Sequence, residues 1–313
     1  MNIKVSMHLM PWEMDHALLI ADRLRQSSYN IDPSDTVYVD TALNLSSLLI
    51  DWEKSKLPKE FFIEKYNTFS KIVEGRIIHR PFVYAGGGLY GHLDLQKSVI
   101  QDNIDYYLTI CPDIDFSTSL LYYMIETAKR VKNKYFIVTP QIFRCWDSSW
   151  DMLVNERFLK YDYKDCIDVD IYDIRNQMNE TQSEVSSFQI QDFKFAGWFD
   201  LYNKDFYEKM VPARPEWSGY GPWDFYAINV SSFAKSRGVD VVQHVVKDEI
   251  VWFYDVGKLK NTEEYGADGL LKTTYTKFLT RKIDKVSQAV DIRSKLNLYI
   301  NEWIKYATDS KII

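Results

Sequence analysis

The feature that most constrains the fold is an alternation of apolar runs with amphipathic stretches in the first half of the chain. Residues 3–9 and 36–40 have the length and composition of strands. Between them, after a break at Met10-Pro11, Leu18, Leu19, Ala21 and Leu24 recur at helical spacing. Alternating strands and helices predict a mixed, mainly parallel sheet flanked by helices, with ligands bound beyond the carboxyl ends of the strands.

The same pattern continues downstream. Strands are expected at 106–110, at 134–139, where Pro140 would end the strand, and near 239–246. Helices are expected at about 93–103 and at 119–130. A further helical turn is suggested by Leu48, Leu49 and Trp52. The face of the helix at 119–130 would be formed by Leu120, Leu121, Met124, Ile125 and Ala128.

We expect one catalytic domain at 1–260, with a donor-binding half at about 1–140 and an acceptor half at about 141–260. Residues 261–313 are predicted to be a C-terminal helical extension packed on this core. The apolar stripe behind that prediction consists of Ile292, Leu296, Ile300, Trp303, Ile304 and Ala307.

Composition excludes several classes of protein. A net charge of −6 argues against a general basic surface that coats nucleic acid. Three cysteines at unrelated spacings suggest neither a disulfide framework nor a zinc site, so we expect a reducing, cytoplasmic compartment. No apolar run approaches the length of a membrane span. The sequence leaves the oligomeric state open.

Two acids follow the strand at 106–110. Asp113 and Asp115 are separated by one residue, so in an extended segment their carboxylates point the same way and can offer hard oxygen ligands to a divalent cation. The alternative is a chance spacing in a chain with 44 acids, because Asp168 and Asp170 have the same spacing.

A second group of candidates lies between residues 195 and 246. Asp224 stands at the predicted start of a helix, where a carboxylate is favoured electrostatically; it is either an N-cap or a functional acid. His244 lies in an apolar strand and is either a core histidine or a ligand. The nearby aromatic residues would fill the core or offer flat surface to a sugar or a base; they are Trp198, Trp217, Tyr220 and Trp223.

The order of these motifs over residues 3–250 resembles that of the GT-A glycosyltransferases. The resemblance implies that Asp115 is the main ligand of a divalent cation, Mn²⁺ or Mg²⁺, and that Asp113 contacts the metal or the nucleotide-sugar donor. It also implies that His244 completes the metal shell and that Asp224 is the base facing the acceptor. Further donor contacts would come from Met10, Pro11, Asp40 and Lys97.

The chain also departs from the family pattern. Where the family commonly has Gly-Glu-Asp, this chain has Gly221-Pro222-Trp223-Asp224, so the role of base depends on Asp224 alone. The basic residue expected before the acid pair is represented by Lys97.

The leading interpretation is a metal-dependent transferase that moves a sugar from a nucleotide-diphosphate sugar to an acceptor hydroxyl, with inversion if Asp224 is the base. The acceptor would be a glycan or a hydroxymethylated base in viral DNA. A nucleotidyltransferase, a glycoside hydrolase and a catalytically silent carbohydrate-binding protein are the alternatives.

Overall fold

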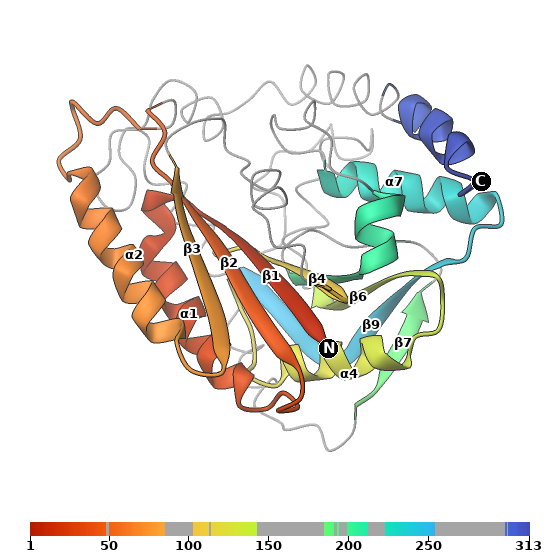
Figure 1. Ribbon diagram of the computed structural model, residues 1–313, viewed down its shortest axis with the longest axis horizontal. Coiled ribbons are helices and arrows are strands. Elements are labelled where there is room, and N and C mark those ends of the chain that lie inside the picture. Colours follow the sequence, from red (N-terminus) through yellow and green to blue (C-terminus); the bar gives the residue numbers. More distant parts are fainter. Residues whose placement is uncertain are drawn as a thin grey trace, which may run out of the picture. The chain divides into compact units, whose positions relative to one another are not determined.

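The structure is a computed structural model of the 313-residue chain (Figure 1). It describes residues 1–47, 50–84, 103–112, 114–142, 185–190, 193, 199–211, 223–253, 298 and 300–313. The side chains of 84, 141–142, 223–226, 248, 250 and 252–253 are not part of this description.

The chain forms two compact units that interleave along the sequence. The first consists of Met1–Tyr122, Ala213–Tyr220 and Phe253–Ile283, and the second of Tyr123–Pro212, Gly221–Trp252 and Asp284–Ile313. The domain boundaries expected near residues 140 and 260 are not tested by this division and stay predictions.

The first unit contains four parallel strands in the order β3-β2-β1-β4. Their bounds are β1 Asn2–Leu9, β2 Thr36–Asn44, β3 Ile77–Tyr84 and β4 Tyr106–Ile110. β1 is hydrogen-bonded to β2 on one side and to β4 on the other, so it lies inside the sheet. Because the four strands run the same way, their carboxyl ends share one edge.

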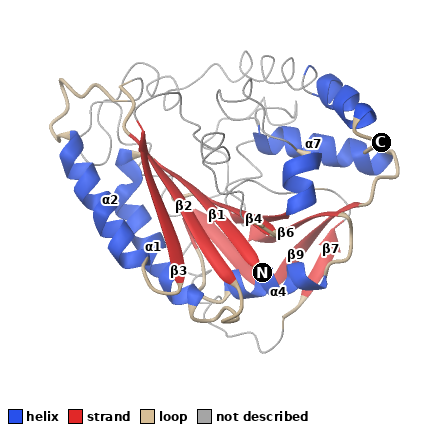
Figure 2. Ribbon diagram, viewed as in Figure 1, coloured by secondary structure: helices blue, strands red, loops and turns tan. Residues whose placement is uncertain are grey.

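Two helices cover one face of this sheet (Figure 2). They are α1, Met14–Ser28, and α2, Lys59–Val73, which pack against each other. The buried side chains of α1 are short or aliphatic, whereas α2 contributes Phe62, Tyr66, Phe69 and Val73. β1 contributes four side chains to the same layer, and all of them are 0% exposed: Ile3, Val5, Met7 and Leu9.

A buried polar network ties α2 to the sheet. The Thr41 hydroxyl lies 2.6 Å from the Tyr66 hydroxyl and 2.7 Å from Nε2 of His79. Burial raises the pKa of Tyr66 to about 12 and lowers the pKa of His79 to about 4. Both side chains are therefore neutral at pH 7, and the network needs no counter-ion.

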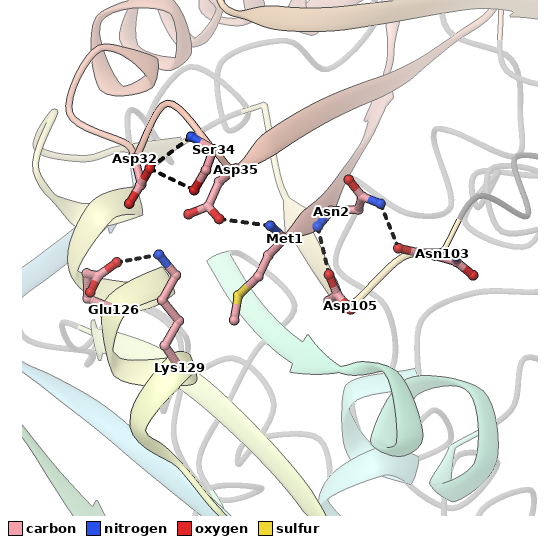
Figure 3. Close-up of polar contacts among 9 residues, drawn as sticks. All are labelled: Met1, Asn2, Asp32, Ser34, Asp35, Asn103, Asp105, Glu126 and Lys129. Carbon is pink, nitrogen blue, oxygen red and sulfur yellow. Dashed lines mark hydrogen bonds and ion pairs between the residues drawn. The ribbon is translucent and has the colours of Figure 1, made fainter.

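The amino end of β1 is held from both sides (Figure 3). The N-terminal ammonium group lies 2.9 Å from Oδ1 of Asp35, just before β2. The backbone N–H of Asn2 donates to Asp105, just before β4, and the Asn2 side chain donates to the carbonyl of Asn103. These contacts support the register of the three strands.

Downstream of β4 come the two-residue strand β5, Ile114–Asp115, and helix α4, Leu120–Arg130. The boundary between the two units falls within α4. The five residues predicted to form its apolar face, Leu120, Leu121, Met124, Ile125 and Ala128, are all at most 1% exposed, which confirms that prediction.

The second unit contains a mixed group of strands. β6, Tyr135–Ile142, pairs in parallel with β9, Val241–Phe253, and antiparallel with β8, Phe199–Asn203. β7, Ser187–Ile190, pairs antiparallel with β9. Together with the first unit, these pairings confirm the predicted α/β class with a mixed, mainly parallel arrangement.

The helices of the second unit include α7, Trp223–Ser236, the π-helix η3, Phe206–Met210, and a C-terminal helix over residues 300–309. Trp303 of the C-terminal helix is 0% exposed, and its indole N–H donates to the carbonyl of Met210 at 2.6 Å. Its ring meets that of Phe233 edge-on. Ala307 of the same helix is also 0% exposed. The prediction that residues 261–313 form one extension packed on the core stays a prediction.

Several predicted boundaries are wrong. β2 extends to Asn44, so Asp40 lies in the middle of the strand and not at its carboxyl end. β6 continues through Pro140 to Ile142, and its register with β9 shifts between Thr139 and Gln141. Proline has no N–H to donate to the ladder, so the strand accommodates it with an irregularity in place of an end.

The expected helical faces also need correction. Leu19, placed on the apolar face of the first helix, is 49% exposed, and Ile20 takes the buried position. The helical turn expected from Leu48, Leu49 and Trp52 is tested only at Trp52, which lies in a non-helical turn, because residues 48–49 lie outside the described residues. The sequence reading also missed α2, whose aromatic face is spread among charged residues.

No helix in the described part of the chain is long and apolar enough to cross a membrane.

We predict that Trp303→Ala lowers the free energy of unfolding by about 3–5 kcal/mol, because it removes a fully buried indole and leaves the Met210 carbonyl without its donor. Urea unfolding followed by circular dichroism measures this. Tyr306→Phe, which removes an exposed hydrogen bond to the Lys209 carbonyl from the same helix, is the matched control and should cost no more than about 1 kcal/mol. Equal losses in the two variants would show that the indole does not anchor the helix.

Candidate functional site

The order of strands in the first unit contains a topological switch point. The chain passes from β1 to β2 and β3 on one side, and then returns to β4 on the other side of β1. The connections therefore leave the carboxyl ends of β1 and β4 in opposite directions, which opens a crevice between them. In open α/β sheets ligands bind in this crevice. The candidate site is the set of residues that follow β1, β2 and β4.

The turn after β1 is locked by two backbone contacts. Met10 and Pro11, both predicted donor contacts, lead into the short helix η1, Pro11–Glu13. The N–H of Met10 donates to the Glu13 carboxylate at 3.1 Å, and the N–H of Glu13 donates back to the Met10 carbonyl at 2.9 Å. Pro11 suits the first helical position because its missing N–H would have no helical partner there. The crevice thus has a well-defined wall on the β1 side.

The turn after β2 is also held by hydrogen bonds. The amide N–H of Ser46 donates to the side-chain oxygen of Asn44 at 3.0 Å, and the indole N–H of Trp52 donates to the Leu45 carbonyl at the same distance. Asn44 and Ser46 are almost completely buried. These residues, and not Asp40, stand at the carboxyl end of β2. The sequence signal that could have shown this is the unbroken strand-like run up to Asn44.

Asp40 is placed away from this edge and is surrounded by cations. It lies in register with Ser6 of β1 and Arg80 of β3. Lys4 and Arg80 both contact its carboxylate. Asp40 as a whole is 3% exposed. Its assignment to donor binding remains a prediction.

Asp115 lies five positions beyond the last residue of β4, in β5. Its Oδ1 accepts a hydrogen bond from the N–H of Phe116 at 2.9 Å and lies 3.3 Å from Nε of Arg23 in α1. The Asp115 side chain is 13% exposed and that of Arg23 is 39% exposed. A carboxylate and a guanidinium thus meet near the surface of the first unit. Asp113 lies outside the described residues.

Arg23 is a candidate that the sequence reading missed. Its position one turn before the end of an amphipathic helix looks like an ordinary solvated arginine, and no local pattern links it to an acid 92 positions later. Only the packing of α1 beside β5 brings the two together. A guanidinium in this place can neutralise an oxyanion or hold the carboxylate in one orientation.

His244 belongs to the second unit, in β9, beside Val138 of β6 and Gln189 of β7. It is partly buried, and burial lowers its pKa below the ordinary value of 6.5. At pH 7 the ring is therefore mainly neutral, which is the form that binds metal ions.

The donor atoms of Asp115 and His244 are of the kinds that bind Mn²⁺ or Mg²⁺, although Mg²⁺ prefers oxygen. Among the described residues, no group of three or more histidine, cysteine, aspartate or glutamate side chains is arranged to hold a metal ion. Since Asp113 is not described, the predicted set of Asp113, Asp115 and His244 stays a prediction.

The remaining predicted site residues are placed only in part. Asp224 is the second residue of α7, so the prediction that it opens a helix is confirmed for the backbone. Its side chain and that of Trp223 are not described. Lys97, Trp198, Trp217 and Tyr220 lie outside the described residues.

Comparisons with known proteins give little further information. No protein-family model and no curated protein matches the chain. Among solved structures, S. aureus TarS (1–349, in complex with UDP-GlcNAc) is similar, with 11% sequence identity and a TM-score of 0.28. The match covers 45% of this chain and 35% of the TarS chain, so the chain spans about a third of the length of that solved chain. A similarity at this level carries no argument about function.

We predict that acid destabilises the protein through its buried histidines. The pKa of His244 and that of His79 lie below 6.5 in the folded chain, the latter at about 4, so below pH 6.5 the unfolded chain binds protons that the folded chain does not. The free energy of unfolding is therefore highest above about pH 6.5 and falls as the pH drops towards 4, for His79 by about 2 kcal/mol when its partial exposure is allowed for.

Urea unfolding at several pH values measures this loss, and NMR titration of the ring protons, assigned with His244→Gln, measures the pKa of His244. A pKa for His244 at or above 6.5 would contradict the prediction.

Proposed function

We propose that the protein is a nucleotide-sugar glycosyltransferase that uses a divalent cation and binds its donor at the carboxyl edge of the first unit. The observation that carries the proposal is the position of Asp115, five residues beyond the end of β4, the strand that pairs with β1 at the switch point. Donor diphosphates need cationic partners and carboxylate-bound metal, and Asp115 with the neighbouring Arg23 guanidinium offers both a carboxylate and a cation.

In this proposal each residue has a separate task. The rigid turn at Met10 and Pro11 would form one wall of the donor pocket, and the turn after β2 would form the next. Asp115 would hold the cation together with Asp113 and His244. Arg23 would orient Asp115 in the free enzyme and balance the charge of the bound diphosphate. Lys97 and Asp40 are the further donor contacts expected from the sequence.

A bound divalent cation would supply charge neutralisation for the departing nucleoside diphosphate. Asp224 would remove the proton from the acceptor hydroxyl, and its place in the first turn of α7 favours the ionised carboxylate that a base requires. If Asp224 removes the proton while the acceptor oxygen attacks the anomeric carbon from the side opposite the diphosphate, the anomeric configuration is inverted. Trp198, Trp217, Tyr220 and Trp223 would form the acceptor surface.

The acceptor is a glycan in the leading form of this proposal. A hydroxymethylated base in viral DNA is the second acceptor that the sequence suggests, because aromatic side chains also stack on a flipped base. A nucleotidyltransferase would use the same metal-binding acids, whereas a silent carbohydrate-binding protein would use neither Asp115 nor Asp224 for turnover. The two kinds of turnover, and binding without turnover, can be told apart by the products released.

We predict that the protein hydrolyses a nucleotide-diphosphate sugar slowly in the presence of Mn²⁺ or Mg²⁺ and that Asp115→Asn reduces this rate at least about 100-fold, because the metal loses its main ligand. A panel of UDP-, GDP- and TDP-sugars, with release of the nucleoside diphosphate as the readout, measures it. EDTA should abolish the activity of the unchanged protein.

Asp22→Asn is the matched control, because Asp22 is an exposed acid of the same unit that pairs with Arg25 and Gln26 on α1. It should retain the full rate. Binding of sugars without any turnover would support the silent binding protein, and transfer of a nucleotidyl group would support the nucleotidyltransferase. Full metal-dependent turnover in Asp115→Asn would refute the assigned role of this residue.

We predict a different result for Asp224→Asn. The variant should bind the donor with unchanged affinity but transfer the sugar to an acceptor about 10²–10⁴-fold more slowly, because only general-base assistance is lost. Transfer to a glycan panel and to hydroxymethylcytosine DNA, with donor affinity measured by calorimetry, gives the two readouts. If transfer is unchanged, Asp224 is not the base and only favours the first turn of α7 electrostatically.

A further inference from the structure

The sheet of the first unit has an unusual second face. Parallel sheets are normally buried on both faces by apolar side chains. Here the face opposite α1 and α2 carries a row of buried polar residues from β1, β2 and β4. Those at most 7% exposed are Lys4, Ser6, His8, Asp40, Asn44 and Thr109, and the partly exposed Arg80 lies beside them. A face of this kind requires a partner for each polar group.

Three charged side chains meet at the centre of this face. Nζ of Lys4 lies 3.3 Å from Oδ2 of Asp40, and Nε of Arg80 lies 2.5 Å from Oδ1 of the same carboxylate. Burial lowers the pKa of Lys4, the Asp40 carboxylate raises it, and the positive charge of Arg80 lowers it further. The Asp40 carboxylate thus holds one edge of the Arg80 guanidinium in place.

The unused hydrogen-bonding capacity lies on Arg80. Its Nη1 and Nη2 atoms are buried, and in the described part of the chain neither has a hydrogen-bond partner. The guanidinium is fixed in place, because Nε is bound to Asp40 and Cζ lies 4.5 Å from the centre of the Tyr38 ring. A buried guanidinium edge without an acceptor is costly. Its two free nitrogens match the two oxygens of a carboxylate or a phosphate group.

We propose that Arg80, supported by Lys4, Asp40 and Tyr38, forms a binding site for an oxyanion, held through two parallel hydrogen bonds from Nη1 and Nη2. The positive charge of Arg80 supplies the electrostatic attraction, and the contacts with Asp40 and Tyr38 supply the preorganisation. Because the guanidinium does not have to be ordered on binding, little conformational entropy is lost.

This site lies within the sheet and not at its carboxyl edge, although it includes Asp40, one of the proposed donor contacts. Arg80 lies in register with Asp40, and the two strands end in register at Asn44 and Tyr84. Four residues of extended chain place Arg80 about 13 Å from the carboxyl edge. β3 is the outermost strand of the unit in the described order, and its neighbouring side chains Ile78 and Phe82 are 48% and 46% exposed. The anion would therefore approach from the side of the sheet, and its binding can be tested without any transferase activity.

Thermal unfolding in sodium phosphate, sodium acetate and sodium chloride at equal ionic strength, pH 7 and in EDTA, tests the proposal. We expect phosphate to raise the midpoint by about 2 °C or more above the value in chloride, because the ligand binds only the folded chain. Arg80→Gln should lose this increment. An increment in acetate that also depends on Arg80 would identify the ligand class as carboxylates, and one confined to phosphate would identify it as phosphates.

Arg76→Gln is the matched control, since Arg76 is an exposed arginine just before β3 whose guanidinium donates to the Tyr29 carbonyl at 3.4 Å. It removes the same charge from the same unit and should keep the increment. The proposal is overturned if chloride gives the same rise as phosphate and acetate, or if Arg80→Gln responds as the unchanged protein does.

A second measurement covers the case in which Arg80→Gln does not fold. Arg80→Lys keeps the charge beside Asp40 but removes the planar pair of donors, so the apparent dissociation constant should rise at least about 5-fold. In the unchanged protein, the guanidinium hydrogens of Arg80 should exchange more slowly with water when phosphate is added, as seen by NMR. Exchange that phosphate does not slow would also overturn the proposal.

Discussion

The structure of the first unit depends on the hydrogen bonding of β1 to strands on both of its sides. β1 takes part in two parallel ladders, one with β2 and one with β4, and contacts from Met1 and Asn2 hold its amino end against the starts of both. Because parallel strands cannot be joined by a tight turn, each partner strand requires a crossover connection. The return of the chain from β3 to β4 across β1 creates the switch point, and with it the only place in this sheet where two connections diverge among the described strands.

The two faces of this sheet differ in the kind of polar group that they bury. On the face covered by α1 and α2, the polar groups are neutral: Thr41, Tyr66 and His79 bond to one another, and burial keeps the histidine uncharged. On the other face the groups are ionised, and Asp40 lies between Lys4 and Arg80. The neutral network is complete within the fold, whereas the charged cluster leaves Nη1 and Nη2 of Arg80 without a hydrogen-bond partner in the described part of the chain. The same strand, β2, supplies residues to both because its side chains alternate between the faces.

Much of the backbone could be predicted from periodicity. The strand at β1 and the apolar face of α4 follow from the spacing of apolar residues, and both agree with the structure. The end of β2 could not be predicted, because Asp40 looks like a strand-terminating acid until its cationic neighbours on β1 and β3 are known. The continuation of β6 past Pro140 could not be predicted for a related reason. The register between β6 and β9 shifts at this point, and such a shift depends on the partner strand β9. For the candidate site, the backbone position of Asp224 and the place of Asp115 after β4 were predictable, but the Arg23 partner of Asp115 was not.

The sequence by itself determined the α/β class, the alternation of strands and helices, and the residue types suited to metal and phosphate chemistry, because these depend on local spacing and on side-chain identity. Only the tertiary structure decided which charges are buried and what they face. Lys4, Asp40 and Arg80 are 36 and 40 positions apart along the chain and meet because three strands lie side by side in one register. Arg23 reaches Asp115 for the same kind of reason, through the packing of a helix beside a distant strand. Electrostatic contacts of this range leave no local pattern in a sequence, and so the neighbours of an acid, unlike its helix or strand, had to be read from the fold.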